Sequence, residues 1–418
     1  MDSLLTFNPA ASTIMLMDVN SCFATIEQQA NPLLRGKPVA VAAFTTPGGC
    51  ILAASVEAKK LGIKTGMRVR DGQKIYKNLI VLPPDPWKYR NVHLGLRKII
   101  SGYTDDFSPK SIDEFVLNLK NYPVLRSKNI RDVALEIKRK IRDEIGEWIT
   151  VSIGIAPNRY LAKIAAGLHK PDGLDEINKD NFLDIYSGLK LTDLTGIKTR
   201  SAVRLNSVGI YNVLDFYHAP LWKIKAAFHS ITSKYWYTRL RGYEVDDVEF
   251  GRRSYGNSVA IGVSISGKSE IAPILSNLVE KMSARMRAAG YTARGVHLSL
   301  IYKDGSSWHQ GRSSQKRLFD SRDIFRESLK LLYKSPFSGN VHNIAVSVFD
   351  LENSSDLQLN FFENVERKKL LMRAVDSVNE SFGDFVIRPA RMLMGKQKVL
   401  DRIAFGGVKE LAEFTFQD

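Results

Sequence analysis

The sequence predicts an α+β protein that is divided into several domains, and three observations support this fold class. The chain has 418 residues, which is enough for two to four domains of ordinary size. Runs rich in β-branched residues, which are typical of strands, alternate with amphipathic stretches of helical periodicity. Residues 257–351 follow the order β-α-β-β-α-β, which is the element order of a ferredoxin-like unit.

The first part of the chain is predicted to contain two strands and three helices. Ile14-Met15-Leu16-Met17 is an apolar run that stops at Asp18, so we expect a buried strand with a carboxylate at its end. A Pro-rich segment at residues 78–86 is predicted to be a boundary. The remaining elements expected here are helices at 21–30, 55–61 and 87–102, a strand at 38–43 and a turn at 45–50.

The rest of the chain begins with a predicted hairpin at residues 107–119, where strand-like residues flank Ser111-Ile112-Asp113-Glu114. Short helices are expected from 179 to 241, then a charged linker, and a mostly helical tail after residue 363. The other expected elements are helices at 132–143, 158–169, 269–289 and 320–333, and strands at 148–155, 257–266, 296–302, 307–313 and 343–351.

Composition indicates a polyanionic partner. The chain carries 60 Lys and Arg residues against 44 Asp and Glu residues, a net charge of +16, and neutralising phosphates would release counterions. No apolar run approaches the ~18 residues of a membrane span. Residues 1–13 lack the features of a secretory signal and are expected to be a short extension. With Cys22 and Cys50 as its two cysteines, the chain is expected in a reducing cytosol, away from membranes.

Three acidic residues stand beside apolar strand residues. Asp18 ends the first strand, and Asp113 and Glu114 have apolar residues on both sides. A carboxylate beside a buried strand is costly unless its charge is compensated, and Mg²⁺ compensates carboxylates well. A pair of such ions activates a 3′-hydroxyl and stabilises a pyrophosphate leaving group. Spacing alone leaves a second interpretation open, in which Asp18 caps the helix that begins near Ser21 and the other two acids lie on an exposed turn.

Three motifs resemble those of Y-family DNA polymerases, and the resemblance extends from Ile14 to Pro389. They occur in family order and with family-like spacing. They are Met17 to Ala24 (MDVNSCFA), Ser111 to Glu114 (SIDE), and a third block of Gly154 to Ala156 (GIA), Leu161 to Ala165 (LAKIA) and Lys170 to Gly173 (KPDG). The segment at 49–62 is similar to the catalytic subunit of bacterial polymerase V, whereas the tail is more similar to polymerase IV enzymes, so the subfamily stays open.

The resemblance implies a right-hand polymerase with a catalytic palm, small fingers, a helical thumb that contains a helix-hairpin-helix, and a ferredoxin-like little finger. The implied boundaries are 1–21 and 87–177 for the palm, 22–86 for the fingers, 178–243 for the thumb, 244–254 for a linker, 255–355 for the little finger, and 356–418 for a C-terminal tail that contains a clamp-binding peptide.

The resemblance also implies roles for single residues. Asp18, Asp113 and Glu114 would be catalytic and would bind two Mg²⁺ ions, for which Mn²⁺ can substitute. The backbone carbonyl of Val19 would be a further metal ligand. Phe23 would be the steric gate, whose ring leaves no room for the 2′-hydroxyl of a ribonucleotide. The nucleotide-binding residues would be Lys170, Lys59 and Lys163.

The fingers depart from the family pattern at two positions. Many members have Tyr and Arg where this chain has Val56 and Lys59. A valine cannot hydrogen-bond a phosphate, and a lysine keeps the charge but loses the planar fork of an arginine. Tight nucleotide binding is therefore in question, although the polymerase V branch shows similar changes.

Several segments are expected to hold DNA or a partner protein. Residues 194–210 resemble a helix-hairpin-helix, whose backbone N–H groups hold a phosphate, with Gly196, Lys198 and Gly209 as the implied contacts. Residues 358–362 are similar to the bacterial sliding-clamp peptide, with Gln358, Leu359, Phe361 and Phe362 as anchors. The candidate backbone contacts of the little finger are Arg252, Arg253, Arg294, Arg312, Lys316 and Arg317.

The function implied is template-directed, error-prone DNA synthesis across lesions, without proofreading. The expected partners are primer-template DNA, dNTPs and the sliding clamp, and the chain is expected to be a monomer; a need for accessory subunits stays open. One alternative is a non-catalytic paralogue that binds DNA or the clamp. Another is a metal-dependent nuclease that uses the same carboxylates, although Phe23 and Lys170 would have no purpose there.

Overall fold

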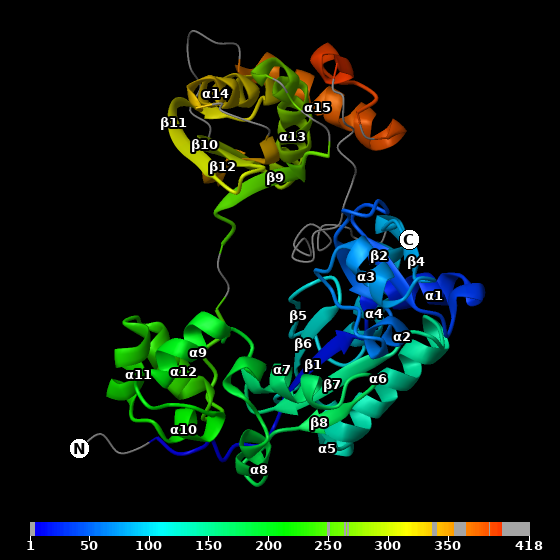
Figure 1. Cartoon of the computed structure of the whole chain (residues 1–418), viewed down its shortest axis with the longest axis vertical. Helices are drawn as coiled ribbons and strands as arrows, with labels where there is room; N and C mark the ends of the chain where they lie inside the picture. The colour runs from blue at the N-terminus through cyan, green and yellow to red at the C-terminus, as the bar shows by residue number, and fades with distance from the viewer. Residues whose placement is uncertain are drawn as a thin grey trace. The chain divides into compact units, whose positions relative to one another are not determined.

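The structure is a computed structural model that describes residues 5–248, 251–262, 265, 267–336, 341–354, 365–383 and 385–394. The chain forms two compact units, and the first ends at Val248 (Figure 1). Both units combine helices with β-sheet. The predicted fold class, α+β with several domains, is therefore confirmed.

A five-stranded sheet in the order β5-β6-β1-β7-β8 organises the first unit. Its central strand, β1, is buried on both faces: Met15 and Met17 belong to one hydrophobic cluster, and Ile14 and Leu16 belong to the other. This double burial explains why the run has no polar alternation. The strands are β1 (Ile14–Val19), β5 (Phe107–Pro109), β6 (Glu114–Asn118), β7 (Val151–Ala156) and β8 (Leu174–Glu176).

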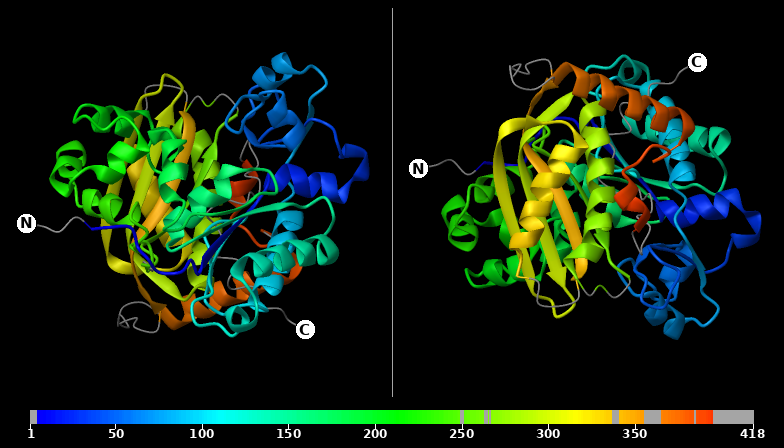
Figure 2. Two further views of the ribbon diagram at one scale, coloured as in Figure 1. Left: turned by 90° about the horizontal axis from the view of Figure 1, so that it is seen from below. Right: turned by 90° about the horizontal axis from the view of Figure 1, so that it is seen from above.

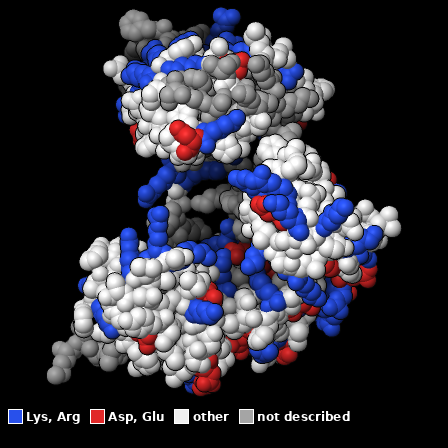
Figure 3. Space-filling view, in the orientation of Figure 1, with Lys and Arg blue, Asp and Glu red and all other residues white. Residues whose placement is uncertain are grey.

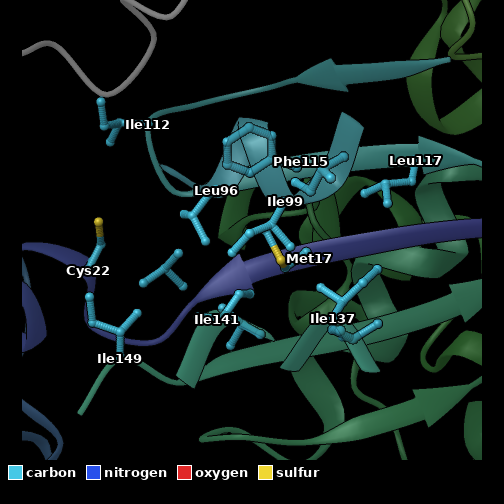
Figure 4. Close-up of a cluster of buried hydrophobic side chains, with 14 of the residues drawn as sticks. Met17, Cys22, Leu96, Ile99, Ile112, Phe115, Leu117, Ile137, Ile141 and Ile149 are labelled. Carbon is cyan, nitrogen blue, oxygen red and sulfur yellow. The ribbon is translucent and has the colours of Figure 1, made fainter. Parts of the chain in front are cut away.

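Helices cover the two faces of this sheet. α4 (Pro86–Ser101) and α6 (Ile130–Glu144) pack on one face, preceded by the short α5 (Val124–Ser127), and α7 (Arg159–Leu168) packs on the other. On α6, apolar residues recur at helical spacing, and Figure 4 shows Ile137 and Ile141 turned toward Met17. Leu96 of α4 and Phe115 of β6 complete the same core.

A smaller sheet in the order β3-β2-β4 lies within residues 22–86. β4 pairs in parallel with β2, so the Pro-rich segment at 78–86 contains a strand and is not only a boundary. Three residues are too few to show a period, which is why the sequence did not predict it. The elements are α1 (Cys22–Ala30), η1 (Pro32–Leu34), β2 (Val39–Ala42), β3 (Ile51–Ala54), α2 (Val56–Lys60), α3 (Val69–Ile75) and β4 (Ile80–Leu82).

Short helices follow the sheet, as predicted. They pack around a core that contains Trp236, Phe216 and Leu205, and this core is continuous with that of α7. Their bounds are α8 (Phe182–Ser187), η2 (Leu191–Asp193), α9 (Thr199–Asn206), α10 (Val213–His218), α11 (Leu221–Phe228) and α12 (Thr232–Arg239).

The segment before β1 is more than an extension. Phe7 stacks on Phe182 with ring centroids 4.1 Å apart, and the backbone N–H of Asn8 donates to the carbonyl of Arg241 at 2.8 Å. Arg241 is almost fully buried, and its Nε donates to the carbonyl of Leu5 at 2.7 Å. The start of the chain is thus built into the helical group, which its sequence did not indicate.

The second unit has the predicted order β-α-β-β-α-β, in a sheet of order β11-β10-β12-β9. α13 and α14 lie together on one face of this sheet (Figures 1 and 2). α15 is tied to α13 by the ion pair between Asp376 and Arg287 at 2.6 Å. The elements are β9 (Ser254–Ala260), α13 (Lys268–Ala288), β10 (Tyr291–Tyr302), β11 (Ser307–Leu318), α14 (Ser321–Lys334), β12 (Val341–Asn353), α15 (Val365–Phe382) and η4 (Ala390–Met394).

Two smaller expectations concern the cysteines and the membrane. Cys22 is buried and Cys50 is exposed, and both are free thiols. Among the residues that the structure describes, no helix has the length and apolar character needed to cross a membrane.

Candidate active site

The pairing of β1 with β6 brings the three predicted carboxylates to one end of the central sheet. Asp18 lies directly opposite Glu114 in the antiparallel register. The backbone N–H of Val19 donates to the carbonyl of Asp113 at 2.9 Å, which ties the neighbouring acid to the same place. The side chain of Ser111 donates to Asp113 Oδ1 at 2.5 Å and accepts from the backbone N–H of Glu114 at 3.1 Å, so the turn is fixed by its own first residue.

A buried histidine supports this turn from behind. Nδ1 of His93, on α4, lies 2.9 Å from the carbonyl oxygen of Ile112, and because a carbonyl only accepts, Nδ1 carries the proton. The ring stacks on Phe115 with centroids 4.8 Å apart, and burial lowers the pKa of His93. The sequence did not point to His93, because a histidine within an amphipathic helix looks like any core residue.

Two lysines reach the carboxylates from α7 and the loop after it. Lys170 Nζ lies 2.7 Å from Asp18 Oδ1, and Lys163 Nζ donates to both carboxylate oxygens of Glu114 at 2.6 and 2.7 Å. α7 can lie this close because Gly154 of β7 has no side chain. A Cβ there would be 2.0 Å from the carbonyl oxygen of Ala162.

The carboxylates are largely buried among charged groups, and the side chains of Asp18 and Glu114 are each 16% exposed. Burial raises the pKa of Asp18 from 3.8 to about 6, against the opposing effect of Lys170. Burial also raises the pKa of Asp113. Lys59 on α2 interacts electrostatically with these groups. Burial lowers the pKa of Lys59, and the neighbouring Lys170 ammonium lowers it further. A cation bound beside these buried carboxylates would favour their ionised form.

The donor set fits a hard divalent cation, since it consists of carboxylate oxygens. Among the described residues, no three His, Cys, Asp or Glu side chains are gathered closely enough to hold a metal ion as they stand. The contacts explain this, because Asp18 is turned to Lys170, Glu114 to Lys163 and Asp113 to Ser111. Small side-chain rotations would have to exchange these partners for a metal.

Comparison with known proteins identifies the family. The family model described as "impB/mucB/samB family" matches residues 17–167, and the model of the C-terminal domain of the same family matches residues 252–361. DNA polymerase IV of Moorella thermoacetica is 32% identical over 395 residues, which are 92% of this chain and 96% of that protein. DNA polymerase IV of Pelotomaculum thermopropionicum is 30% identical over 380 residues, which are 90% and 94% of the two chains. The chain belongs to the Y family of translesion DNA polymerases.

Solved structures agree on the fold. The Y-family polymerase chimera Dbh-Dpo4(243-245)-Dbh superposes with a TM-score of 0.71 at 24% identity, over 81% of this chain and 98% of the chimera. The insertion ternary complex of Dbh DNA polymerase superposes with a TM-score of 0.58, over 80% and 98% of the two chains. The polymerase is of the DinB type and is a DNA-directed DNA polymerase, and enzymes of its family use divalent metal ions.

In the polymerase, Phe23 is 1% exposed and stacks on Tyr89, with centroids 4.2 Å apart and 10° between the ring planes. The Tyr89 hydroxyl donates to Glu27 Oε1 at 2.9 Å, and Lys88 Nζ lies 2.8 Å from Glu27 Oε2. Phe23 and Glu27 are one turn apart on α1, so both face α4. The ring of Phe23, the predicted gate, is therefore fixed where α1 packs on α4.

Lys59 is positioned by the capped helix α2. Ser55 accepts from the backbone N–H of Ala58 at 3.2 Å and begins α2, so that Val56 lies in its first turn and Lys59 in its last. Val56 is half-buried and offers no polar group. A half-buried valine in the first turn of α2 cannot hydrogen-bond a phosphate, so in this helix Lys59 carries the predicted contact with the nucleotide.

The predicted DNA-contact residues have different surroundings. Gly196 and Gly209 have φ of 95° and 73°, which favours glycine, and Lys198 begins α9. Arg253 and Arg294 are exposed, as is Lys316, whereas the guanidinium of Arg252 lies 4.0 Å from the centroid of the Tyr255 ring. On the face drawn in Figure 3, Lys and Arg side chains cover more of the surface than Asp and Glu side chains do, in keeping with the net charge of +16.

Two arginines of β11 are engaged within the protein. Arg312 lies 3.5 Å from Glu327 of α14, and Arg317 pairs with Glu352 of β12. A contact with DNA would have to compete with these acids. The predicted clamp peptide, Gln358 to Phe362, lies outside the described residues.

Proposed function

We propose that Asp18, Asp113 and Glu114 hold two Mg²⁺ ions, with the backbone carbonyl of Val19 as a further ligand and with Mn²⁺ able to substitute. The carboxylate donor set and the raised pKa values of Asp18 and Asp113 support this assignment. When bound, the ions activate the primer 3′-hydroxyl and neutralise charge on the triphosphate.

The reaction proposed is nucleotidyl transfer. The primer 3′-oxygen forms a bond to the α-phosphorus of the dNTP, the bond to the β,γ-pyrophosphate breaks, and the hydroxyl proton is released. Lys170 and Lys59 neutralise charge on the triphosphate, because they already lie together beside Asp18. Lys163 keeps Glu114 oriented through its two hydrogen bonds.

The wider assignment keeps the predicted domains and partners. Residues 1–21 and 87–177 form the palm, with the other domain boundaries as predicted, and primer-template DNA is held by the thumb hairpins and the little finger. Residues 358–362 bind the sliding clamp. The enzyme acts as a cytoplasmic monomer with low fidelity and without proofreading.

The observation that carries the proposal is the register of β1 and β6, which sets Asp18 opposite Glu114 beside the Val19–Asp113 hydrogen bond. The test is primer extension with purified protein, Mg²⁺ and dNTPs, comparing wild type with Asp113→Ala. The matched control is Asp105→Ala, since Asp105 is an exposed acid just before the same hairpin.

Extension is expected from wild type and Asp105→Ala and is expected to be absent from Asp113→Ala. Synthesis by Asp113→Ala at the wild-type rate would remove this residue from the catalytic set. A wild-type protein that binds DNA without extending it would indicate the non-catalytic paralogue, and one that degrades the primer would indicate the nuclease.

A further inference from the structure

The loop that presents Lys170 contains a residue in an unfavourable conformation. Residues 170–173 follow α7, and Lys170 at their start reaches Asp18 at 2.7 Å. Asp172 has a left-handed backbone with φ of 59°. Residues other than glycine adopt this conformation at a cost, so surrounding contacts must compensate for it. The groups that hold Asp172 therefore decide where Lys170 lies.

Asn20 holds this loop from the side of β1. Its Oδ1 accepts from the backbone N–H of Asp172 at 2.8 Å and from Thr150 Oγ1 at 3.0 Å. Its Nδ2 donates to Ser152 Oγ at 2.9 Å. Asn20 is almost fully buried and stands two residues after Asp18. The strand that ends in a predicted metal ligand is thus joined to the loop through one buried amide.

Lys138 holds the loop from α6. Its ammonium donates to the carbonyls of Asp172 and Gly173, at 2.5 and 3.3 Å, and forms an ion pair with Asp172 Oδ1 at 2.8 Å. The Lys138 side chain is 13% exposed, so the ammonium is largely removed from water. These contacts match the three donors of a lysine and all go to one loop, which makes Lys138 a directional anchor.

We propose that Lys138 is a positioning residue for nucleotide binding, which fixes the 170–173 loop so that Lys170 meets the triphosphate of the incoming dNTP. The proposal rests on the proposed role of Lys170. A metal ion bound by Asp18 would compete with Lys170 for that carboxylate, and a Lys170 that moves to the triphosphate gives up its ion pair with Asp18. Lys138 and Asn20 then still hold Asp172, while Gly173 stays bonded to β7 through Ser152 Oγ and the backbone N–H of Ile153, at 3.3 and 3.0 Å.

The test is steady-state single-nucleotide incorporation by the full-length enzyme with Lys138→Met, which keeps the aliphatic stem and removes the three donors. We expect KM for the dNTP to rise about tenfold with a smaller change in kcat and an unchanged Kd for primer-template DNA, because only binding of the triphosphate is misaligned. Lys138→Arg should restore part of the loss. Lys140→Met, on the same helix but paired with Glu136, is the matched control and should behave as wild type.

A second comparison separates positioning from folding. In a Lys170→Ala background, Lys138→Met should add little to KM, since the residue through which it acts is gone. An equal rise in both backgrounds, or an unchanged KM in the single variant, would overturn the positioning role. If Lys170→Ala itself has wild-type kinetics, the proposed triphosphate contact is wrong. If Lys170→Ala is impaired and Lys138→Met is not, the role of Lys138 alone is wrong.

Discussion

The ring of Phe23 lies flat against the ring of Tyr89, with 4.2 Å between their centroids. Since Tyr89 is itself hydrogen-bonded to Glu27, the predicted gate has a rigid backing. A side chain that selects deoxyribose by steric exclusion must not move aside when a 2′-hydroxyl approaches it. If Phe23 is the gate, this stack makes the choice of sugar depend on the packing of α1 on α4.

Shortening the gate should relax that choice. Phe23→Ala is expected to raise the ratio of ribonucleotide to deoxynucleotide incorporation by about tenfold or more, because it removes the clash with the 2′-hydroxyl. The measurement is single-nucleotide incorporation with matched rNTP and dNTP. Phe23→Leu, which disturbs the core less, should give a smaller change in the same direction. An unchanged ratio in both variants would reject the gate.

The close packing of β7 on α7 should tolerate no side chain at Gly154. A Cβ at this position would meet the backbone N of Ala166 at 2.2 Å as well as the carbonyl of Ala162. We expect Gly154→Ala to lower the free energy of unfolding by about 3 kcal/mol, as measured by urea denaturation. Gly167→Ala, on α7, is the control. Nothing lies within 4 Å of the position of the added Cβ, so this substitution should stabilise the protein by up to about 1 kcal/mol. Equal stability of the two variants would contradict the packing.

The metal-free enzyme should become less stable as pH rises through about 6. The pKa of Asp18 is about 6 in the folded chain and near 3.8 in the unfolded chain, so the folded state keeps this proton to a higher pH. The resulting contribution to stability is complete below pH 3.8 and is lost as pH rises through about 6. Asp18→Asn cannot ionise, so its melting temperature at pH 8 should lie above that of the wild type. The shift should be about 2–4 °C for each kcal/mol gained in the free energy of unfolding, and it should shrink toward pH 5. Asp105→Asn should show no such pH dependence.

Magnesium should reverse this loss. If the carboxylates bind Mg²⁺, the ion stabilises the folded state by an amount that grows with its concentration, about 1.4 kcal/mol at tenfold excess over Kd. A rise in the melting temperature at pH 8 is expected for wild type and is expected to be absent from Asp113→Ala. An equal rise in both proteins would place the binding elsewhere.

The proposed clamp peptide can be tested apart from catalysis. Deleting residues 358–362 should weaken pull-down by the sliding clamp and leave distributive synthesis largely intact, since the peptide supplies anchors for a partner and no catalytic group. Asn360→Ala changes the variable position of the motif and should retain clamp binding. Loss of basal synthesis in the deletion would mean that the segment supports the fold.

Long periodic elements were predictable from sequence, whereas the very short strands β4 and β8 were not. The apolar run of β1 and the helical pattern of α6 have enough repeats to reveal a period. β4 and β8 have three residues each and exist because a neighbouring strand supplies partners, β2 for the first and β7 for the second. The packing of Phe7 on Phe182 depends on residues far apart in the chain, which no local pattern encodes.

The sequence predicted those residues of the site that belong to recognisable motifs, and not the residues that support them. Asp18, Asp113 and Glu114 meet because of a strand register that spacing alone could not fix. His93 and Lys138 act on backbone carbonyls, which leave no mark on the sequence. Arg312 remains a predicted DNA contact, but its proximity to Glu327 could not be predicted, since the sequence does not tell which way a long basic side chain turns.

The attachment of Leu5 to Arg241 and Tyr237 has a consequence for synthesis on the ribosome. The backbone N–H of Leu5 donates to the hydroxyl of Tyr237 at 3.2 Å, from 232 positions away. At roughly 5–20 residues per second, Leu5 waits about 10–50 s for that partner to be translated. Leu5 thus cannot reach these native contacts until the helical group that contains Tyr237 and Arg241 has been made.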